Sequence, residues 1–241
     1  MRFALVIASQ YAPASLLGPL ASVAGPELEA AAKAWQPVYA DVAAPTDIRV
    51  VSSPNELTDD DWPFIFNPTI NIPADLAYHY LKADAHGIQR PYGLILADVY
   101  QPPRRIQRGG WHEMIEAMID AWINRYDPDG YSVEVADFGQ EYPVERYAPN
   151  GVSVLLSPWA TPAWFGLGPG TEFDSVGICT EPHQILDGGY AQRLVNGKLV
   201  DLPPGYRPAP HKLGPHSRRS KRHRAFSLRS TLPTGAPMVR V

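Results

Sequence analysis

The sequence predicts an α+β domain, and three observations lead to this class. Apolar residues make up 45% of the 241 residues and charged residues 19%, as in chains that bury a core. The 26 prolines and 19 glycines favour short elements joined by turns, which argues against a helical bundle or a coiled coil. One segment has clear helical periodicity, whereas several others form short apolar or alternating runs, as strands do. No apolar run reaches the roughly 18 residues that a membrane-spanning helix needs.

Charge is divided unevenly along the chain, although the net charge is only −4. Residues 1–201 hold all 25 acidic residues and 12 basic ones, so their charge is −13. Residues 202–241 hold nine basic residues, no acidic residue and no hydrophobic periodicity. We therefore predict one α+β domain over residues 1–201 and a non-globular basic C-terminal arm over residues 202–241.

The N-terminal half begins with a predicted strand, Phe3–Ser9, whose apolar run is too short for a secretory signal, so secretion is not expected. Leu16–Trp35 is rich in Ala and Leu and predicts one or two helices, with a break at Gly25 and Pro26. The next predicted elements are short strands over Val38–Ala43 and Ile48–Ser52, an extended or irregular segment over Trp62–Ile72, a helix over Ala74–Ala83 and a buried strand over Tyr92–Tyr100.

The C-terminal half contains the clearest helix of the sequence, Trp111–Arg125, whose apolar residues recur at spacings of three and four. A loop rich in Pro and Arg precedes this helix, and a turn at Asp127–Gly130 follows it. The remaining predicted elements are a strand over Tyr131–Ala136, a strand over Val152–Leu156 within long loops, and a hairpin of Arg193–Val195 and Lys198–Val200 around Asn196-Gly197.

The helix Trp111–Arg125 carries a pattern of residues that is typical of metal sites. His112 and Glu116 are four residues apart and so project from the same helical face, with Glu113 beside them. In metallohydrolases with this spacing, the two outer residues bind zinc and the intervening glutamate acts as general base. Asp120 lies four residues further on, where it could be a ligand, an acceptor for His112 or a solvated charge.

His112 and Glu116 on this helix supply only two ligands, so a third must come from elsewhere in the chain. The segment after the helix offers Glu134, Asp137 and Glu141. A turn and a returning strand would bring Asp137 near the helix. Glu134 and Asp137 would face opposite sides of a regular strand, so both can contribute only where the strand ends or bulges.

This combination resembles a motif of zincin-like proteins from bacteria and their phages. The resemblance begins with His112-Glu113-x-x-Glu116-x-x-x-Asp120 and continues with Glu134-Val135-x-Asp137. Further similar segments are Asn150-Gly151-Val152, Thr161-Pro162-Ala163-Trp164-Phe165 and Pro182–Tyr190, so the resemblance covers roughly residues 61–190. It implies a zincin-like fold, with a small twisted sheet, an active-site helix and a loop-rich C-terminal half.

The resemblance also implies roles for individual residues. His112, Glu116 and Asp137 would bind the metal, and Glu113 would act as the base of a metal-dependent peptidase. The sequence departs from the motif at Trp111, Ala121 and Ala136, where the motif has a small residue, a proline and a cysteine. A tryptophan at position 111 could crowd the substrate side of the ion.

Two carboxylates and one imidazole favour zinc and also admit calcium or manganese. They largely neutralise a divalent ion and so make it a weaker Lewis acid than a site with three histidines does. A structural metal site and a helix without metal therefore remain alternatives to a hydrolase. The single cysteine, Cys179, excludes an intrachain disulfide and is expected to be a small buried residue. For His183, a hydrogen-bonded loop position is expected rather than metal ligation.

The predicted arm contains a run of basic residues that suits a phosphate backbone or an acidic protein surface. Its basic residues between positions 211 and 224 are Lys212, Arg218, Arg219, Lys221, Arg222 and Arg224. We expect the arm to anchor the domain to protein subunits of a larger assembly, such as a phage particle, or to nucleic acid. The location would then be a virion or the cytoplasm of a bacterial host. The alternatives are a purely structural capsid or tail protein and an arm that serves only solubility.

Overall fold

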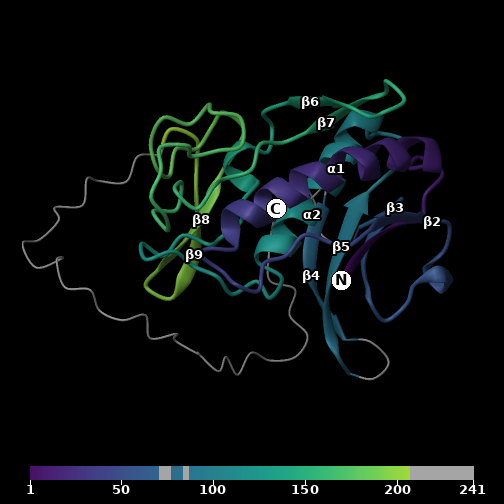
Figure 1. Cartoon of the computed structure of the whole chain (residues 1–241), viewed down its shortest axis with the longest axis horizontal. Helices are drawn as coiled ribbons and strands as arrows, with labels where there is room; N and C mark the ends of the chain where they lie inside the picture. Colours follow the sequence, from purple (N-terminus) through teal and green to yellow (C-terminus); the bar gives the residue numbers. More distant parts are fainter. Residues whose placement is uncertain (71–76, 84–86, 207–241) are drawn as a thin grey trace, which may run out of the picture.

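The computed structural model describes residues 1–70, 77–83 and 87–206, so nearly all of the predicted basic arm lies outside the described residues. This includes the six basic residues at positions 212–224. The described part of the chain combines two α-helices with a mixed sheet and two hairpins (Figure 1). The predicted mixture of helices and sheet is confirmed. No helix among the described residues has the length and hydrophobicity needed to cross a membrane.

The central sheet has five strands in the order β2–β1–β3–β5–β4. β1, β2, β3 and β5 are parallel, and the edge strand β4 runs antiparallel to β5. Parallel neighbours need a crossover connection, which α1 supplies between β1 and β2. The bounds of these elements are β1 Arg2–Ile7, α1 Ala14–Trp35, β2 Ile48–Val51, η1 Pro54–Glu56, β3 Asp61–Asn67, β4 Ala77–Ala83 and β5 Gln89–Leu96.

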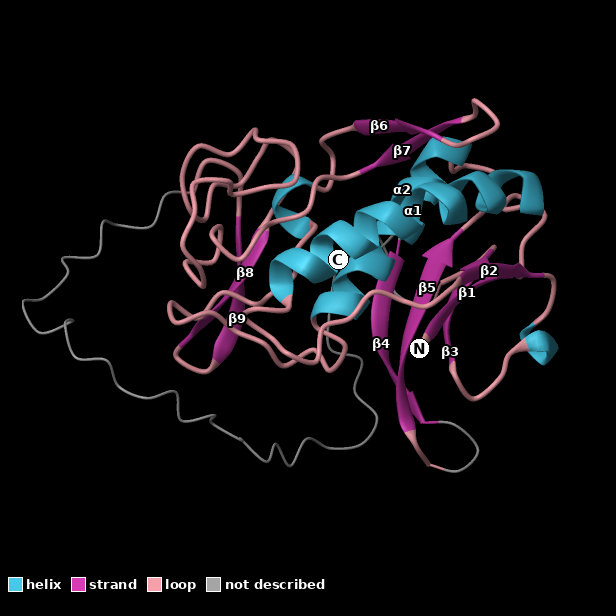
Figure 2. Ribbon diagram, viewed as in Figure 1, coloured by secondary structure: helices cyan, strands magenta, loops and turns pink. Residues whose placement is uncertain are grey.

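Both α-helices cover the same face of the sheet (Figure 2). The second helix, α2, spans Pro103–Ile119. It packs tightly against the sheet and α1 at Gly110, where a Cβ atom would lie 2.6 Å from the Phe66 ring and 3.2 Å from Leu20. A larger residue at position 110 would push α2 away from the sheet, and the side chain of His112 would move with it.

Strand alternation divides the apolar residues between the two faces of the sheet. In β3, Phe64 and Phe66 point toward the helices and belong to the main core. Ile65 points away and joins Ala4 and Val6 in a smaller cluster on the other face. The main core therefore lies between the sheet and the helices, and the buried polar residues described below lie in this layer.

The C-terminal half is rich in loops, as predicted, and packs against both helices. Two buried indoles connect the loops to the helices. Trp35 Nε1 of α1 donates to the carbonyl of Ala160 at 3.0 Å, and Trp111 Nε1 of α2 donates to the carbonyl of Ser157 at 2.9 Å. The regular elements in this half are η2 Asp137–Gly139, β6 Val144–Tyr147, β7 Ser153–Leu156, β8 Ala191–Val195 and β9 Lys198–Leu202.

Several predicted strands are confirmed, with small shifts at their ends. The hairpin turn forms as expected, since Asn196 and Gly197 adopt φ values of 51° and 77°, which a tight hairpin of this kind needs. The confirmed strands are those predicted over Phe3–Ser9, Ile48–Ser52, Tyr92–Tyr100 and Val152–Leu156, which correspond to β1, β2, β5 and β7. The segment predicted to be extended or irregular from Trp62 onward forms most of β3.

The predicted break at Gly25 and Pro26 is wrong, because α1 continues through both residues and also through Pro19. An internal proline costs a helix about 3 kcal/mol through a lost hydrogen bond and a steric clash. Burial of an apolar side chain such as Leu20 or Leu28 contributes about 1.5–3 kcal/mol, and the helix buries several such residues against the sheet. Tertiary packing therefore outweighs the local signal.

Three other predicted elements are also wrong. Val38–Ala43 forms turns, and Tyr131–Ala136 contributes only isolated bridges, at Tyr131 and Ser132. Ala74–Ala83 was expected to be helical, but its described part, Ala77–Ala83, is strand β4. Pairing with β5 along the whole length of β4 stabilises this strand, and Tyr80 packs against Tyr92 across the pair at 4.9 Å.

The helix predicted over Trp111–Arg125 forms, but both of its ends lie earlier in the chain. It begins at Pro103 because a proline suits the first turn of a helix, where its missing N–H is not needed. It ends at Ile119 because Asp120 leaves the helical conformation. The Asp120 carboxylate then accepts hydrogen bonds from the backbone amides of Asn124 and Arg125 at 3.1 and 3.0 Å.

Candidate metal centre

The structure brings together the three residues that the motif marks as metal ligands. His112 and Glu116 extend from the same side of α2, and Asp137 reaches them from η2. His112 Nε2 lies 3.1 Å from Glu116 Oε2 and 3.2 Å from Asp137 Oδ1. All three side chains are buried, and their ligand atoms lie close enough together to hold one metal ion.

The distances around His112 match the edges of a metal coordination shell. With bonds of about 2.0–2.1 Å, neighbouring ligands of a tetrahedral zinc ion lie about 3.3 Å apart. His112 Nε2 has two carboxylate oxygens near that separation, but makes a hydrogen bond of normal geometry with no described residue. The two carboxylates therefore lie beside His112 Nε2 without hydrogen-bond alignment to it. Ligands of a shared metal ion have this arrangement.

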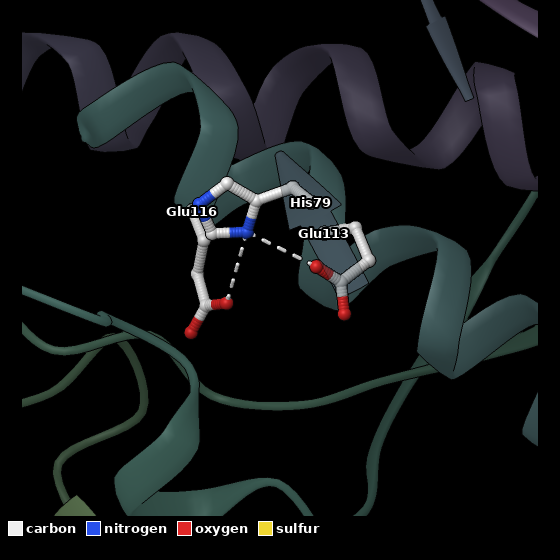
Figure 3. A group of neighbouring side chains, drawn as sticks. All are labelled: His79, Glu113 and Glu116. Carbon is white, nitrogen blue, oxygen red and sulfur yellow. Dashed lines mark hydrogen bonds and ion pairs between the residues drawn. The ribbon is translucent and has the colours of Figure 1, made fainter. Parts of the chain in front are cut away.

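A second group of possible ligands lies beside the first and contains a histidine that the sequence analysis did not identify. His79 Nδ1 lies 3.1 Å from Glu113 Oε2 and 3.8 Å from Glu116 Oε2 (Figure 3). All three residues are buried, and their ligand atoms could also hold one metal ion. Glu116 thus belongs to both groups.

His79 reaches the centre because β4 is a strand. Alternation turns Tyr78 and Tyr80 to one face, where their rings pack together at 5.3 Å. His79 points to the opposite face, which α2 covers. A helix over this segment would not produce this alternation. Because the sequence analysis predicted a helix here, it did not identify His79 as a candidate ligand. The signal that could have revealed it is the Tyr-His-Tyr pattern, which is typical of a strand.

Glu116 and Asp137 are held in place by backbone contacts. Glu116 Oε1 accepts a hydrogen bond from the backbone amide of Ala136 at 3.0 Å, which directs Oε2 toward the two histidines. The carbonyl of Asp137 accepts from the amide of Tyr190 at 3.1 Å. Beside it, Gly189 lies so close to η2 that a Cβ atom would collide with the carbonyl of Phe138. The segment Pro182–Tyr190 thereby positions η2 and its aspartate.

The other three candidate ligands lie in different surroundings. Glu134 is buried beside His79, with its Oε2 atom 3.9 Å from His79 Nε2. Asp120 is buried, but it caps the end of α2 and belongs to neither ligand group. Glu141 is partly exposed and pairs with Arg108 at 2.5 Å, so it lies at the surface rather than among the ligands.

Electrostatics within the centre favour the uptake of positive charge. Burial by itself lowers the pKa of both histidines, but the adjacent carboxylates outweigh it, so the pKa of His79 is raised to about 10 and that of His112 lies well above its usual value. Burial and the charge of Glu116 raise the pKa of Asp137 to about 7 and that of Glu134 well above its usual value. A bound cation would relieve this excess of negative charge.

A small pocket connects the centre to the surface. Its volume is about 40 Å³, and His112, Glu113 and Gly109 line it together with Arg105, Arg108, Ala77, Gln140 and Glu141. A water molecule needs roughly 10–15 Å³ of such space, so the pocket has room for a few waters. Trp111 does not line the pocket and is buried in the core. The expectation that it crowds the substrate side is therefore wrong.

His183 is a hydrogen-bonded buried residue, as expected. Its Nε2 atom lies 2.8 Å from Asp127 Oδ2, and its ring stacks on Tyr131 at 4.1 Å. It belongs to neither ligand group. Because it is a buried histidine with a carboxylate partner outside the centre, it provides a matched control for His79.

Cys179 should react slowly with alkylating reagents in the folded protein. Burial and then the charge of Asp174 raise the pKa of its thiol well above the usual range, so the reactive thiolate is scarce at neutral and mildly alkaline pH. We expect iodoacetamide at pH 8 to modify the native chain at least roughly 100-fold more slowly than the urea-unfolded chain. Mass spectrometry of timed samples measures both rates, and equal rates would contradict the prediction.

Comparison with known proteins adds no relative: no family model, no curated protein and no solved structure matches this chain.

Proposed function

We propose that the chain binds a divalent metal ion through His112, Glu116 and Asp137 and uses it to hydrolyse a peptide bond. One observation carries the metal assignment. His112 Nε2 lies 3.1 and 3.2 Å from two buried carboxylate oxygens, yet makes a hydrogen bond of normal geometry with no described residue. Burying such a group without a partner is costly, and a shared cation would remove that cost.

The donor set indicates which ions fit. One imidazole and two carboxylates suit zinc best and also admit manganese or calcium. The three protein ligands leave further coordination positions free, as in catalytic rather than structural zinc sites. The pocket is lined by His112 and Glu113 and has room for a few waters, so water can approach the ion from this side.

Hydrolysis needs an electrophile and a base, and this centre offers both. A divalent ion here would supply Lewis acidity, polarising a carbonyl oxygen and lowering the pKa of water. Glu113 lines the pocket, and its Oε1 atom makes no hydrogen bond with any described residue, so it is available to take a proton from water. Arg108 and Glu141 pair at the pocket wall, and a peptide would have to displace this pair to enter.

Replacement of the proposed base tests the enzymatic part of this proposal. Glu113→Gln should reduce hydrolysis of an unfolded protein substrate by about 100-fold or more, because general base catalysis contributes roughly 10²–10⁴ in rate. The ion at His112, Glu116 and Asp137 should remain, since Glu113 is not one of its ligands. Release of labelled peptides measures activity, and mass spectrometry of the metal content measures binding.

Glu29→Gln is the matched control, because Glu29 is an exposed glutamate on α1, away from the centre. It should keep both activity and metal. If Glu113→Gln were as active as the unmodified chain, the enzymatic proposal would be wrong. The predicted virion assembly depends on residues 207–241, which lie outside the described residues, so it stays a prediction from the sequence.

A further inference from the structure

We propose that the centre holds two divalent ions, bridged by Glu116, with the second ion bound by His79 and Glu113. This inference rests on the proposed function, since it adds an ion to the one assigned to His112, Glu116 and Asp137. His79 belongs neither to the helix motif nor to any of the segments that carry the zincin-like resemblance. The second ion therefore follows from the tertiary structure alone.

The position of Glu116 makes it a bridge. Its Oε1 atom is occupied by the backbone amide of Ala136. Its Oε2 atom lies 3.1 Å from His112 Nε2 and 3.8 Å from His79 Nδ1. One carboxylate oxygen thus faces two imidazoles that come from different elements, α2 and β4. In two-metal sites the ions lie about 3.5–4 Å apart, a distance that a shared carboxylate oxygen spans.

Each ion would have a complete set of three protein ligands. The first has His112, Asp137 and the shared Glu116. The second has His79, Glu113 and the same glutamate, and the ligand atoms of this group also lie within one coordination shell of each other. Glu113 would bind through Oε2, which is 3.1 Å from His79 Nδ1, and would keep Oε1 free to accept a proton.

Glu134 lies on the side of His79 where a metal-binding histidine usually has a carboxylate partner. Such histidines usually pass their second ring N–H to a carboxylate, which fixes the tautomer and the ring orientation. His79 Nε2 faces Glu134 Oε2 at 3.9 Å, and both atoms are buried with no hydrogen bond to any described residue. With Nε2 directed at Glu134, the other nitrogen, Nδ1, is the one presented to Glu113 and Glu116.

The charges of the centre balance with two ions but not with one. Glu113, Glu116, Glu134 and Asp137 are buried, each has an oxygen within 3.9 Å of a ring nitrogen of His79 or His112, and together they carry four negative charges when ionised. Two divalent ions neutralise them while both imidazoles stay neutral and free to bind metal. One ion would leave two negative charges buried, which is costly unless protons replace the missing ion. A protonated His79 in place of the second ion is therefore the rival arrangement.

Binding of Mn²⁺ to the purified full-length chain distinguishes the two arrangements. We expect two Mn²⁺ ions per chain by metal analysis after dialysis, with an electron paramagnetic resonance spectrum that shows spin coupling between them. His79→Gln should retain one ion, and its spectrum should become that of an isolated Mn²⁺. His183→Gln should retain both ions and their coupling, because His183 lies outside both ligand groups.

The possible results separate this inference from the function on which it rests. One uncoupled ion in the unmodified chain, unaffected by His79→Gln, would overturn the second site and leave the first intact. Two ions without spin coupling would overturn the Glu116 bridge. An absence of Mn²⁺ and of Zn²⁺ from the unmodified chain would overturn both proposals. The measurements on the unmodified chain decide between these outcomes even if the His79 variant does not fold.

Discussion

Glu116→Gln should reduce the affinity of the chain for divalent ions by more than about 100-fold. Even the loss of a residue that only orients a metal ligand lowers metal affinity by about 10–100-fold. The amide oxygen of glutamine can still accept from the backbone amide of Ala136, so the side chain should keep its place. Its NH₂ group would then face His79 and His112 in place of the ligand oxygen. Calorimetric titration with Zn²⁺ and metal analysis after dialysis measure the loss.

Glu141→Gln is the control for this variant, because the sequence marked Glu141 as an alternative ligand whereas the structure pairs it with Arg108 at the surface. We expect this variant to bind metal like the unmodified chain. If Glu141→Gln lost the ion and Glu116→Gln kept it, the ligand assignment would be wrong. Circular dichroism of both variants establishes that each is folded before the titrations are compared.

Removal of metal should lower the midpoint of thermal unfolding by roughly 8–16 °C. A ligand at about 1,000 times its dissociation constant stabilises the folded state by about 4 kcal/mol. Each kcal/mol corresponds to roughly 2–4 °C for a domain of this size. The physical reason is the excess of buried carboxylates around His79 and His112, which repel one another without a cation. Calorimetric scans with Zn²⁺ and with a chelator measure the difference.

The same scans on Glu116→Gln provide the control, because a chain that binds the ion more than about 100-fold more weakly should keep at most about a third of this shift at the same Zn²⁺ concentration. A shift of equal size in this variant would mean that the metal stabilises the chain at some other place. Identical midpoints for the unmodified chain under both conditions would argue against a metal centre altogether.

Local sequence signals predicted those parts of the fold that depend on near neighbours. The apolar run at Phe3–Ser9 and the Asn196-Gly197 turn required no information from distant residues, and β1 and the β8–β9 hairpin form as expected. The helix that carries His112 was found for the same reason, although Pro103 rather than Trp111 begins it. Its four-residue spacing placed His112 and Glu116 on one face.

Signals failed where packing overrode local preference. A break was expected at Gly25 and Pro26, but α1 buries one face against the sheet and continues through both residues. The segment Ala77–Ala83 is short enough to fit either a helical or a strand period, and its pairing with β5 decides for the strand. The strand conformation turns His79 toward α2. Because a helix was predicted for this segment, His79 was left out of the predicted site.

The sequence alone determined that His112, Glu113 and Glu116 lie together on one helix, because helical periodicity is a local property of the chain. It also marked Asp137 as a candidate, because a turn and a returning strand would bring this residue near the helix, and the resemblance implied that it is a ligand. Only the tertiary structure decided that His79 joins this cluster and that Glu134 lies beside His79. It also decided that Glu141 stays outside the cluster, at the surface. These outcomes depend on which strand pairs with β5 and on how closely the loop around Gly189 packs against η2. Contacts between residues far apart in the chain determine both, and the spacing of residues along the chain does not encode them.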